Sequence, residues 1–191
     1  KQAVRHGVDV IGHANYLDDE AVDMLEAKRD QIFVCPAIAW EITLLDRGSE
    51  LGLPRDAMEQ RGYQREVDET ISAVKRLRDS KVRVLVGGDY GLNITPHGTN
   101  SKDLEYFVDL FGMSTSEALL CATRDGGAAA DTSGMVGTLE EGKYADLVIV
   151  DGNPLEDIRI LQDHSRIVGV MKDGVMHCAL MQKNPYIAPD E

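Results

Sequence analysis

The sequence has no long hydrophobic run and few cysteines. No apolar stretch approaches the roughly 20 residues needed to cross a bilayer, and the opening residues 1–7 lack the apolar core of a signal peptide. The three cysteines, Cys35, Cys121 and Cys178, lie far apart and form no CxxC pair. We therefore expect neither a disulfide framework nor a zinc–thiolate site. Each thiol is predicted to be a small buried hydrophobic group in a reducing, cytoplasmic environment.

Positive charge is also scarce. Twenty Lys and Arg residues face 33 Asp and Glu residues, which gives a formal net charge of -13. This excess would repel phosphate groups, so no nucleic-acid partner is expected, and the lack of apolar runs predicts no membrane partner. The simplest interpretation of the charge is a solvated acidic surface that aids solubility.

The chain does not begin with methionine, and residues 1–7 resemble the last turn of a helix that began earlier. We therefore expect these 191 residues to be part of a longer polypeptide, whose own N-terminus could carry a signal peptide. By length alone the chain amounts to about one domain and can bury a sizeable core.

Up to about residue 131 the apolar pattern alternates between strand and helix, which predicts parallel strands with crossover helices. An acidic cap at Asp18 precedes one helix, and Ser114 with Glu117 forms a capping box for another. The stretch from Trp40 to about Leu53 has a less regular pattern. The predicted strands are 8–14, 32–38 and 82–86, and the predicted helices lie near 21–25, 55–80, 104–111 and 114–122.

After residue 131 the pattern changes to glycine-punctuated short strands. Residues 145–150 read as a strand that ends in a turn. Asp173-Gly174 between the apolar runs 167–171 and 175–177 is the signature of a tight hairpin. We predict three segments: a first domain over 1–131, a small β module over 132–181, and a polar tail over 182–191 that is either a surface arm or partly disordered.

Two polar residues, His13 and Asp89, stand at the carboxyl ends of predicted parallel strands. Catalytic groups gather at these ends in parallel barrels, and imidazole and carboxylate both suit a divalent cation such as zinc. Spacing alone leaves two simpler roles open: a hydrogen-bonded structural histidine, and an aspartate that stabilises its glycine-rich turn. The turn 87–91 fits neither common phosphate-loop pattern.

Residues Gly137–Leu147 read G-x-L-x-x-G-x-x-A-D-L, the most specific motif of the chain. Four further segments accompany it: Gly7–Ala14 with Leu17–Glu20, Val82–Gly91, Ser114–Thr123 and Lys172–Val175. Together these segments resemble the amidohydrolase superfamily, in which the four correspond to the sixth barrel strand, the eighth strand, the helix after the barrel and the last hairpin of a β-sandwich. The resemblance covers nearly the whole chain and is closest to the imidazolonepropionase-like group, which includes Xaa-Pro and Xaa-Arg/Lys dipeptidases and an ochratoxin-type amidase.

The resemblance implies an α/β fold: the C-terminal part of a (β/α)8 TIM barrel followed by part of a small β-sandwich. It implies hydrolysis of a C–N bond in a small-molecule amide, dipeptide or cyclic amide substrate. It also implies one or two divalent metal ions, with Zn²⁺ expected, bound by His13 and Asp89, and Asp89 as the proton shuttle. The other family ligands, a His-x-His pair, a lysine or glutamate and a further histidine, are expected before Lys1, in the missing N-terminal part of the same enzyme.

Five residues near strand ends are weaker candidates for the substrate pocket: Tyr16, Trp40, Glu41, Tyr90 and His97. For each of them packing or loop surface is the alternative. His6, His164, His177 and Arg124 are assigned structural or surface roles.

Two other interpretations remain open. The chain could be an inactive fragment, because half a barrel leaves open sheet edges and two ligands bind a metal weakly. It could also be a binding or scaffold protein that keeps His13 and Asp89 for structure. We expect the assembled protein to be a homo-oligomer.

Overall fold

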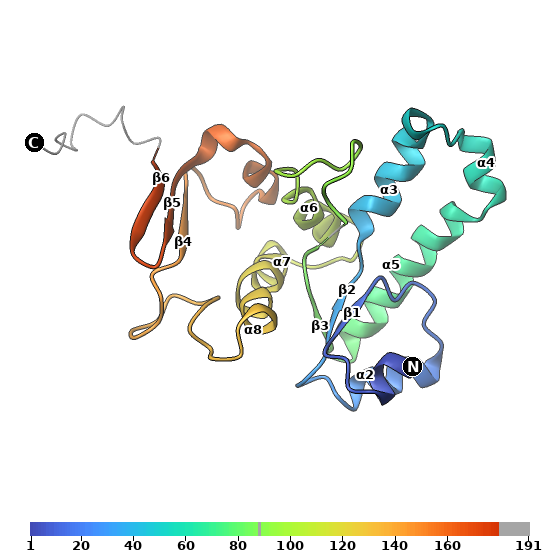
Figure 1. The fold of residues 1–191 in the computed structure, drawn as a ribbon, viewed down its shortest axis with the longest axis horizontal. Coiled ribbons are helices and arrows are strands. Elements are labelled where there is room, and N and C mark those ends of the chain that lie inside the picture. The colour runs from blue at the N-terminus through green and yellow to red at the C-terminus, as the bar shows by residue number, and fades with distance from the viewer. Residues whose placement is uncertain (88, 180–191) are drawn as a thin grey trace, which may run out of the picture.

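The structure is a computed structural model that describes residues 1–87 and 89–179. Gly88, the last two residues of the predicted β module and the predicted tail 182–191 lie outside the described residues. The chain contains two small sheets, one parallel and one antiparallel. Figure 1 shows the antiparallel sheet at one end of the molecule, helices α6 to α8 in the middle, and helices α3 to α5 on the far side of the parallel sheet.

The parallel sheet has the order β1-β2-β3 and confirms the predicted alternation of strand and helix. Its strands are β1 (Val10–Gly12), β2 (Phe33–Cys35) and β3 (Arg83–Val84). All three are shorter than predicted, because the paired register covers only these residues. The residues that continue each apolar run form the loops at the carboxyl edge.

Helices connect the parallel strands and continue after them. In chain order they are α1 (Gln2–Arg5), α2 (Asp19–Glu26), α3 (Ile38–Arg47), the 3-10 helix η1 (Gly48–Leu51), α4 (Arg55–Gln60), α5 (Tyr63–Asp79), α6 (Lys102–Asp109), α7 (Thr115–Leu120), the π-helix η2 (Cys121–Asp125) and α8 (Gly126–Ala130). Both predicted caps are confirmed. The Asp18 side chain accepts a hydrogen bond from Ala21 N, and Ser114 and Glu117 form the capping box of α7.

Two helix predictions were wrong. The stretch from Trp40 to Leu53 is not irregular, because α3 and η1 occupy most of it. Ile38, Leu44 and Leu45 bury one face of α3, but the helix starts at an alanine that offers no capping side chain, so the sequence carries no start signal. The single helix predicted over 55–80 is two helices, separated at Gly62 by a backbone φ of +82°.

The core lies between the parallel sheet and the helices on either side of it. Val34 in β2, Ile38 in α3 and Leu77 in α5 are fully buried, and Phe107 and Phe111 pack ring against ring, with centroids 5.1 Å apart. This core holds the three strands together, so that their carboxyl ends share one edge.

The second sheet has the order β4-β5-β6 and is antiparallel. Its elements are β4 (Leu147–Val150), the 3-10 helices η3 (Ile158–Gln162) and η4 (His164–Arg166), β5 (Ile167–Lys172) and β6 (Val175–Ala179). The predicted Asp173-Gly174 hairpin is confirmed. Both residues have positive φ, 49° and 76°, as the tightest two-residue turns require.

The segment that precedes β4 docks on the helices through two glycines. Gly137 has a φ of +93°, and a side chain there would lie 2.8 Å from Thr123 O and 3.0 Å from Gly127 Cα. The backbone of this segment therefore rests directly on η2 and α8. The first glycine of the predicted signature at 137–147 is needed for this close approach.

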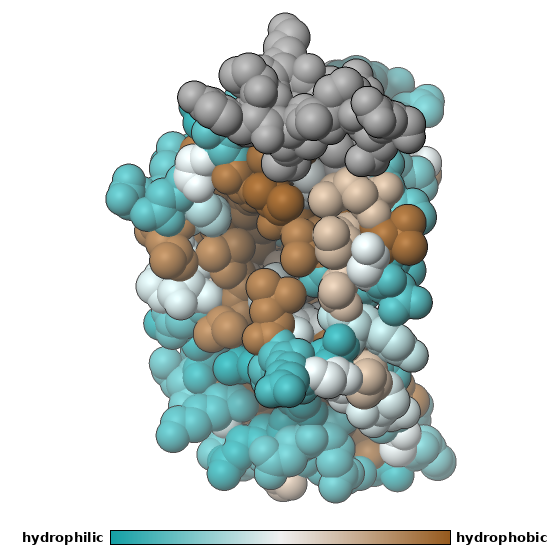
Figure 2. Space-filling view, turned by 90° about the vertical axis from the view of Figure 1, so that its left-hand side faces the viewer, coloured by the Kyte–Doolittle hydropathy of each residue, from teal (hydrophilic) through white to brown (hydrophobic). Residues whose placement is uncertain are grey.

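The antiparallel sheet and the segment before it carry exposed hydrophobic side chains. Figure 2 shows them gathered on this end of the molecule. They include Leu139, Tyr144, Val148, Val175 and Met176. No helix in the described part of the chain is long and apolar enough to span a membrane.

The predicted burial of the cysteines holds for Cys121, whereas Cys35 is half-buried. The side chain of Cys178 lies outside the described part.

Candidate metal and active site

The candidate site lies at the carboxyl edge of the parallel sheet. His13 directly follows β1, Cys35 is the last residue of β2, and Asp89 lies in the loop after β3. Because the three strands are parallel and paired in register, their ends lie side by side. The fold therefore brings His13 and Asp89 to the same edge, as predicted from their positions after strands.

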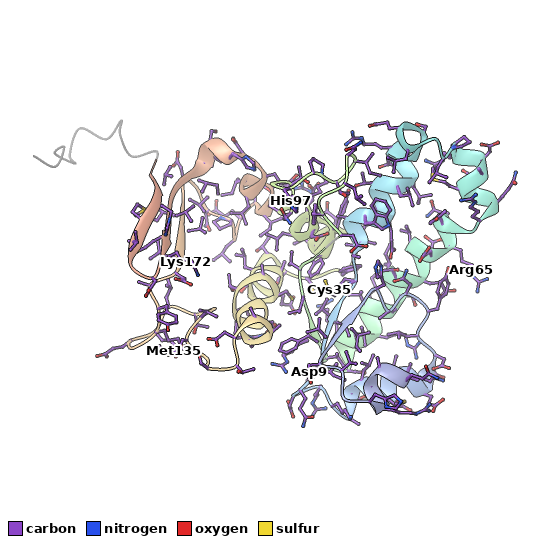
Figure 3. The ribbon with its side chains drawn as sticks, viewed as in Figure 1. Asp9, Cys35, Arg65, His97, Met135 and Lys172 are labelled. Carbon is purple, nitrogen blue, oxygen red and sulfur yellow. The ribbon has the colours of Figure 1, made fainter. Side chains whose placement is uncertain are left out.

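Hydrogen bonds through Cys35 connect the three strand ends. His13 N donates to Cys35 O at 2.8 Å, and Cys35 Sγ donates to Gly87 O at 3.1 Å. Burial raises the pKa of the Cys35 thiol, and this keeps it protonated as a donor. Figure 3 shows Cys35 in the middle of the molecule, where the strands end.

The backbone at this edge is left-handed at four residues other than glycine. His13 and Ala14 have φ of 61° and 59°, Ala37 has 52°, and Asp89 has 52°. Such a conformation is uncommon for residues with a side chain and collects at functional sites, where the surroundings hold it in place. These four residues lie after all three strands and turn the chain sharply at the edge.

His13 and Asp89 face each other. His13 Nε2 lies 3.3 Å from Asp89 Oδ2, and their side chains are 47% and 54% exposed. The Thr95 hydroxyl donates to Asp89 O at 3.0 Å and anchors the backbone of this residue. About half of each side chain is thus open to a ligand, while its backbone is held.

The pair fits as part of a zinc site. Two donors bound to one tetrahedral zinc ion at about 2.0–2.1 Å lie about 3.3–3.4 Å apart, and this matches the separation of His13 Nε2 and Asp89 Oδ2. An imidazole nitrogen and a carboxylate oxygen are both suitable ligands. Among residues 1–87 and 89–179, however, no group of three or more His, Cys, Asp or Glu could hold a metal ion. The described residues therefore supply two metal ligands, and a complete zinc site needs more.

The five predicted pocket residues lie in different surroundings. Tyr16 is 58% exposed, and Trp40 packs against the core. His97 is exposed in the loop between β3 and α6 (Figure 3), with its ring beside Gly91. Tyr90 lines a separate cleft of about 480 Å³ together with residues of α3 and α6, and neither His13 nor Asp89 belongs to its walls.

Glu41 lies in a buried polar cluster between α3 and α5. It is 4% exposed, both of its carboxylate oxygens lack a hydrogen-bond partner, and burial raises its pKa to about 7. The Thr70 hydroxyl and Asn15 lie close enough to oppose this rise, and Asn15 donates to Glu66 at 2.6 Å. This cluster is linked to the site by Asn15, two residues after His13.

Asp103, which the sequence pattern did not single out, is a fully buried carboxylate in the first turn of α6. Its Oδ1 accepts a hydrogen bond from Ala39 N at 3.3 Å. Burial raises its pKa to about 6, which the nearby N–H groups of Ala39 and Gly87 and the Tyr90 hydroxyl partly oppose. One signal was available: Asp103 precedes the buried Phe107 by four residues and so shares the apolar face of its helix.

A family model for the amidohydrolase family matches residues 1–176. The chain therefore belongs to the amidohydrolase family. Its α/β fold is similar to those of solved proteins of this kind.

Individual relatives extend this likeness. The chain is 27% identical to ochratoxinase of Aspergillus niger over 188 residues. These residues make up 98% of this chain and 36% of the relative. It resembles a putative prolidase of Bifidobacterium longum with a TM-score of 0.81 and 28% identity, covering 92% of this chain and 43% of that structure. A Xaa-Pro dipeptidase with bound methionine in the active site matches with a TM-score of 0.78 and 26% identity. This match covers 93% of this chain and 42% of that structure. The chain thus spans less than half the length of each of these proteins.

Proposed function

We propose that this chain carries part of the active site of a metal-dependent hydrolase that cleaves a C–N bond in an amide, dipeptide or cyclic amide. The observation that carries the proposal is the approach of His13 Nε2 to Asp89 Oδ2, 3.3 Å apart at the carboxyl edge of the parallel sheet. Membership of the amidohydrolase family supports it. The named activities of the relatives, an ochratoxinase and a Xaa-Pro dipeptidase, favour a small amide or peptide substrate.

We assign the parallel sheet to the last three strands of a (β/α)8 barrel, within residues 1–131, and the antiparallel sheet to part of a β-sandwich, within residues 132–181. Two features favour this assignment. Among the described strands, β1 and β3 each pair on one side only, and open edges of this kind are normally covered. The exposed apolar face around Val148 and Val175 would suit a second sheet layer.

His13 and Asp89 would hold a divalent ion, with Zn²⁺ as the ion that suits an imidazole and a carboxylate. When bound, the ion would supply Lewis acidity that polarises the substrate carbonyl and brings the pKa of a nearby water toward neutrality. Asp89 Oδ2 then accepts the proton of the attacking water and delivers it to the leaving nitrogen as the C–N bond breaks. His13 faces Asp89 and would help to hold the ion at this edge of the sheet.

The remaining metal ligands would come from sequence outside these 191 residues, in the rest of the same enzyme. By themselves the 191 residues would then be inactive, since two ligands bind an ion weakly. We further propose a homo-oligomer as the working assembly. Of the weaker pocket candidates, Tyr16 and His97 remain open to solvent and could contact the substrate, whereas Trp40 and Glu41 are held in the interior.

The test uses the longer polypeptide that contains this chain, assayed on N-acyl amino acids and on Xaa-Pro and Xaa-Arg dipeptides. Asp89→Asn should lower kcat by at least about 100-fold, because the proton acceptor is lost. His13→Ala should lower the bound zinc measured by mass spectrometry. Full activity in Asp89→Asn would rule out the proposed mechanism, and a metal-free, inactive parent would favour the scaffold alternative.

Two matched controls lie outside the site. Asp9→Asn changes an exposed aspartate directly before β1, and His177→Ala changes an exposed histidine of β6. Both should leave metal content and kcat unchanged.

A further inference from the structure

The backbone from Asp89 to Thr95 forms a closed loop, which we call the Asp89 loop. The Thr95 hydroxyl closes it by donating to Asp89 O at 3.0 Å. The Thr95 carbonyl accepts from Gly91 N at 2.7 Å, and the Thr95 N–H donates to Leu92 O at 3.1 Å. Leu92 and Thr95 also pair as an antiparallel bridge. The N–H, the carbonyl and the hydroxyl of Thr95 are therefore all used inside this loop.

Thr95 itself is held by the interior of the protein. It is 2% exposed, as is its neighbour Ile94. Arg47 of α3 donates from Nη1 to Ile94 O at 3.2 Å. Pro96 follows directly, and a residue before proline is restricted to extended backbone conformations. Thr95 is thus a fixed point that can hold the other end of the Asp89 loop.

Asp89 has much less support from its own side chain. The side chain is 54% exposed, so packing leaves the carboxylate room to turn. The backbone of Asp89 has a φ of 52°, and such a left-handed conformation persists where the surroundings hold it. The Thr95 hydroxyl supplies a hold of this kind, because it binds the carbonyl of Asp89 itself.

We propose that Thr95 is a positioning residue for Asp89: its buried hydroxyl fixes the Asp89 carbonyl and, with it, the backbone from which the carboxylate faces His13. Without this hydrogen bond the backbone could turn, and Asp89 Oδ2 would leave its place 3.3 Å from His13 Nε2. The effect on catalysis rests on the function proposed above, whereas the hold on the backbone does not.

The hold is first measured on the 191-residue chain by amide hydrogen exchange, resolved by NMR. Thr95→Val keeps the shape of the side chain and removes the hydroxyl, whereas Thr95→Ser keeps the hydroxyl. Thr99→Val is the matched control, because the Thr99 hydroxyl donates at 2.7 Å to Pro96 O and not to Asp89. We expect the Gly91 N–H to exchange about 10-fold faster in Thr95→Val, as the loss of one hydrogen bond allows. Thr95→Ser and Thr99→Val should keep the parent rate.

A second amide separates a local effect from a global one. The Leu85 N–H donates to Val34 O at 2.8 Å, beside the paired ends of β2 and β3, and its exchange should stay unchanged in all variants. Equal acceleration at Leu85 and Gly91 would show that the hydroxyl stabilises the whole fold, and this would overturn the proposal. An unchanged Gly91 rate in Thr95→Val, or the same acceleration in Thr95→Ser, would overturn it as well.

Thr95→Ala provides another variant if Thr95→Val does not fold. It also removes the hydroxyl, but it places no methyl group against Asp89 O. Its Gly91 N–H should exchange faster in the same way, and a parent rate there would contradict the proposed hold.

The catalytic consequence is measured on the longer enzyme. Thr95→Val should lower kcat or zinc affinity by about 10-fold, the lower end for groups that orient metal ligands, because the hydroxyl holds the backbone of Asp89 and not its carboxylate. KM should change little, and Thr95→Ser should restore most of the loss. An unchanged kcat and zinc affinity in Thr95→Val would overturn the positioning role. A parent enzyme without amidase activity would instead reject the proposed function, and the Gly91 exchange rate would still decide whether Thr95 holds the Asp89 loop.

Discussion

Gly87 decides how closely the ends of β2 and β3 approach each other. A Cβ at this position would lie 2.6 Å from Cys35 Sγ, well inside van der Waals contact. The thiol could rotate away, but it would then lose its hydrogen bond to Gly87 O. Because glycine has no side chain, the Cys35 thiol can keep its hydrogen bond between the strand ends. This hydrogen bond also fixes the path of the backbone that leads to Asp89.

We predict that Gly87→Ala lowers the free energy of unfolding by about 1–3 kcal/mol, the usual cost of overpacking a close contact. Urea unfolding of the purified chain measures it. The double variant Gly87→Ala/Cys35→Ala removes the sulfur that the new methyl group would strike, so it should recover part of the loss. If the double variant loses the sum of the two single effects, the clash is not the cause.

The N-termini of helices are capped in two ways, by a residue of the helix itself or by a distant residue. Helix α7 carries its own capping box, in which Glu117 N donates to Ser114 Oγ and Ser114 N donates to Glu117. Helix α3 depends on Asp103 instead. The first arrangement is local and readable from sequence, and the second exists only in the folded chain.

Ser114→Ala should therefore cost about 1 kcal/mol of stability, as the loss of an N-cap usually does. Ser116→Ala is a matched control in the same helix, because Ser116 is exposed, and we expect a change within about 0.5 kcal/mol. Equal losses in the two variants, measured by thermal and urea unfolding, would show that the capping box contributes nothing.

The docking of the segment before β4 on α8 depends on Gly137. Gly137→Ala should destabilise the protein by about 2 kcal/mol or more, since it combines a left-handed backbone with a clash against Thr123 O. Gly134→Ala isolates the backbone effect, because Gly134 has a φ of +74° and open space around it. Its cost should be about 1 kcal/mol. Differential scanning calorimetry of both variants compares them, and a cost for Gly134→Ala as large as that for Gly137→Ala would contradict the packing argument.

The described part of the molecule has fully and partly buried carboxyl groups whose pKa values are shifted in opposite directions. Burial raises the pKa of Glu41 to about 7 and that of Asp103 to about 6. The pKa of Glu105 is lowered to about 2, against its desolvation, by hydrogen bonds from Lys102, Gln162 and Arg159. Glu105 thus favours the folded state when charged, whereas Glu41 and Asp103 favour it when protonated.

The sign of the pH dependence follows from proton binding. Between about pH 4.5 and 7 the folded state holds protons on Glu41 and Asp103 that the unfolded state has released, so stability falls as the pH rises. Below about pH 4.5 Glu105 becomes protonated in the unfolded state while it stays charged in the folded state, so stability falls as the pH drops. We predict that the free energy of unfolding, measured in urea from pH 3 to pH 8, is highest near pH 4–5.

Glu41→Gln should flatten the decline above pH 5 and raise stability at pH 8 by about 1–3 kcal/mol. Glu59→Gln, at an exposed position of α4, is the control and should leave the profile unchanged. A Glu41→Gln profile that still falls as steeply as that of the parent would show that this carboxyl is not the source.

Sequence alone determined the features that depend on near neighbours. Alternating apolar periods, the caps at Asp18 and Ser114 and the Asp173-Gly174 hairpin are local signals, and the structure confirms each of them. The place of His13 and Asp89 after strands was also visible, since parallel strands must end on the same side.

Tertiary structure alone decided the features that depend on distant partners. The start of α3 was unreadable because its cap comes from Asp103, 64 residues further along the chain. The separation of 3.3 Å between His13 and Asp89 depends on how β1 and β3 pair with β2. The burial of Glu41 depends in the same way on how α5 packs against α3. In each case the physical reason is the same: a pKa, a cap or a metal-ligand distance is set by atoms that only the packed chain brings together.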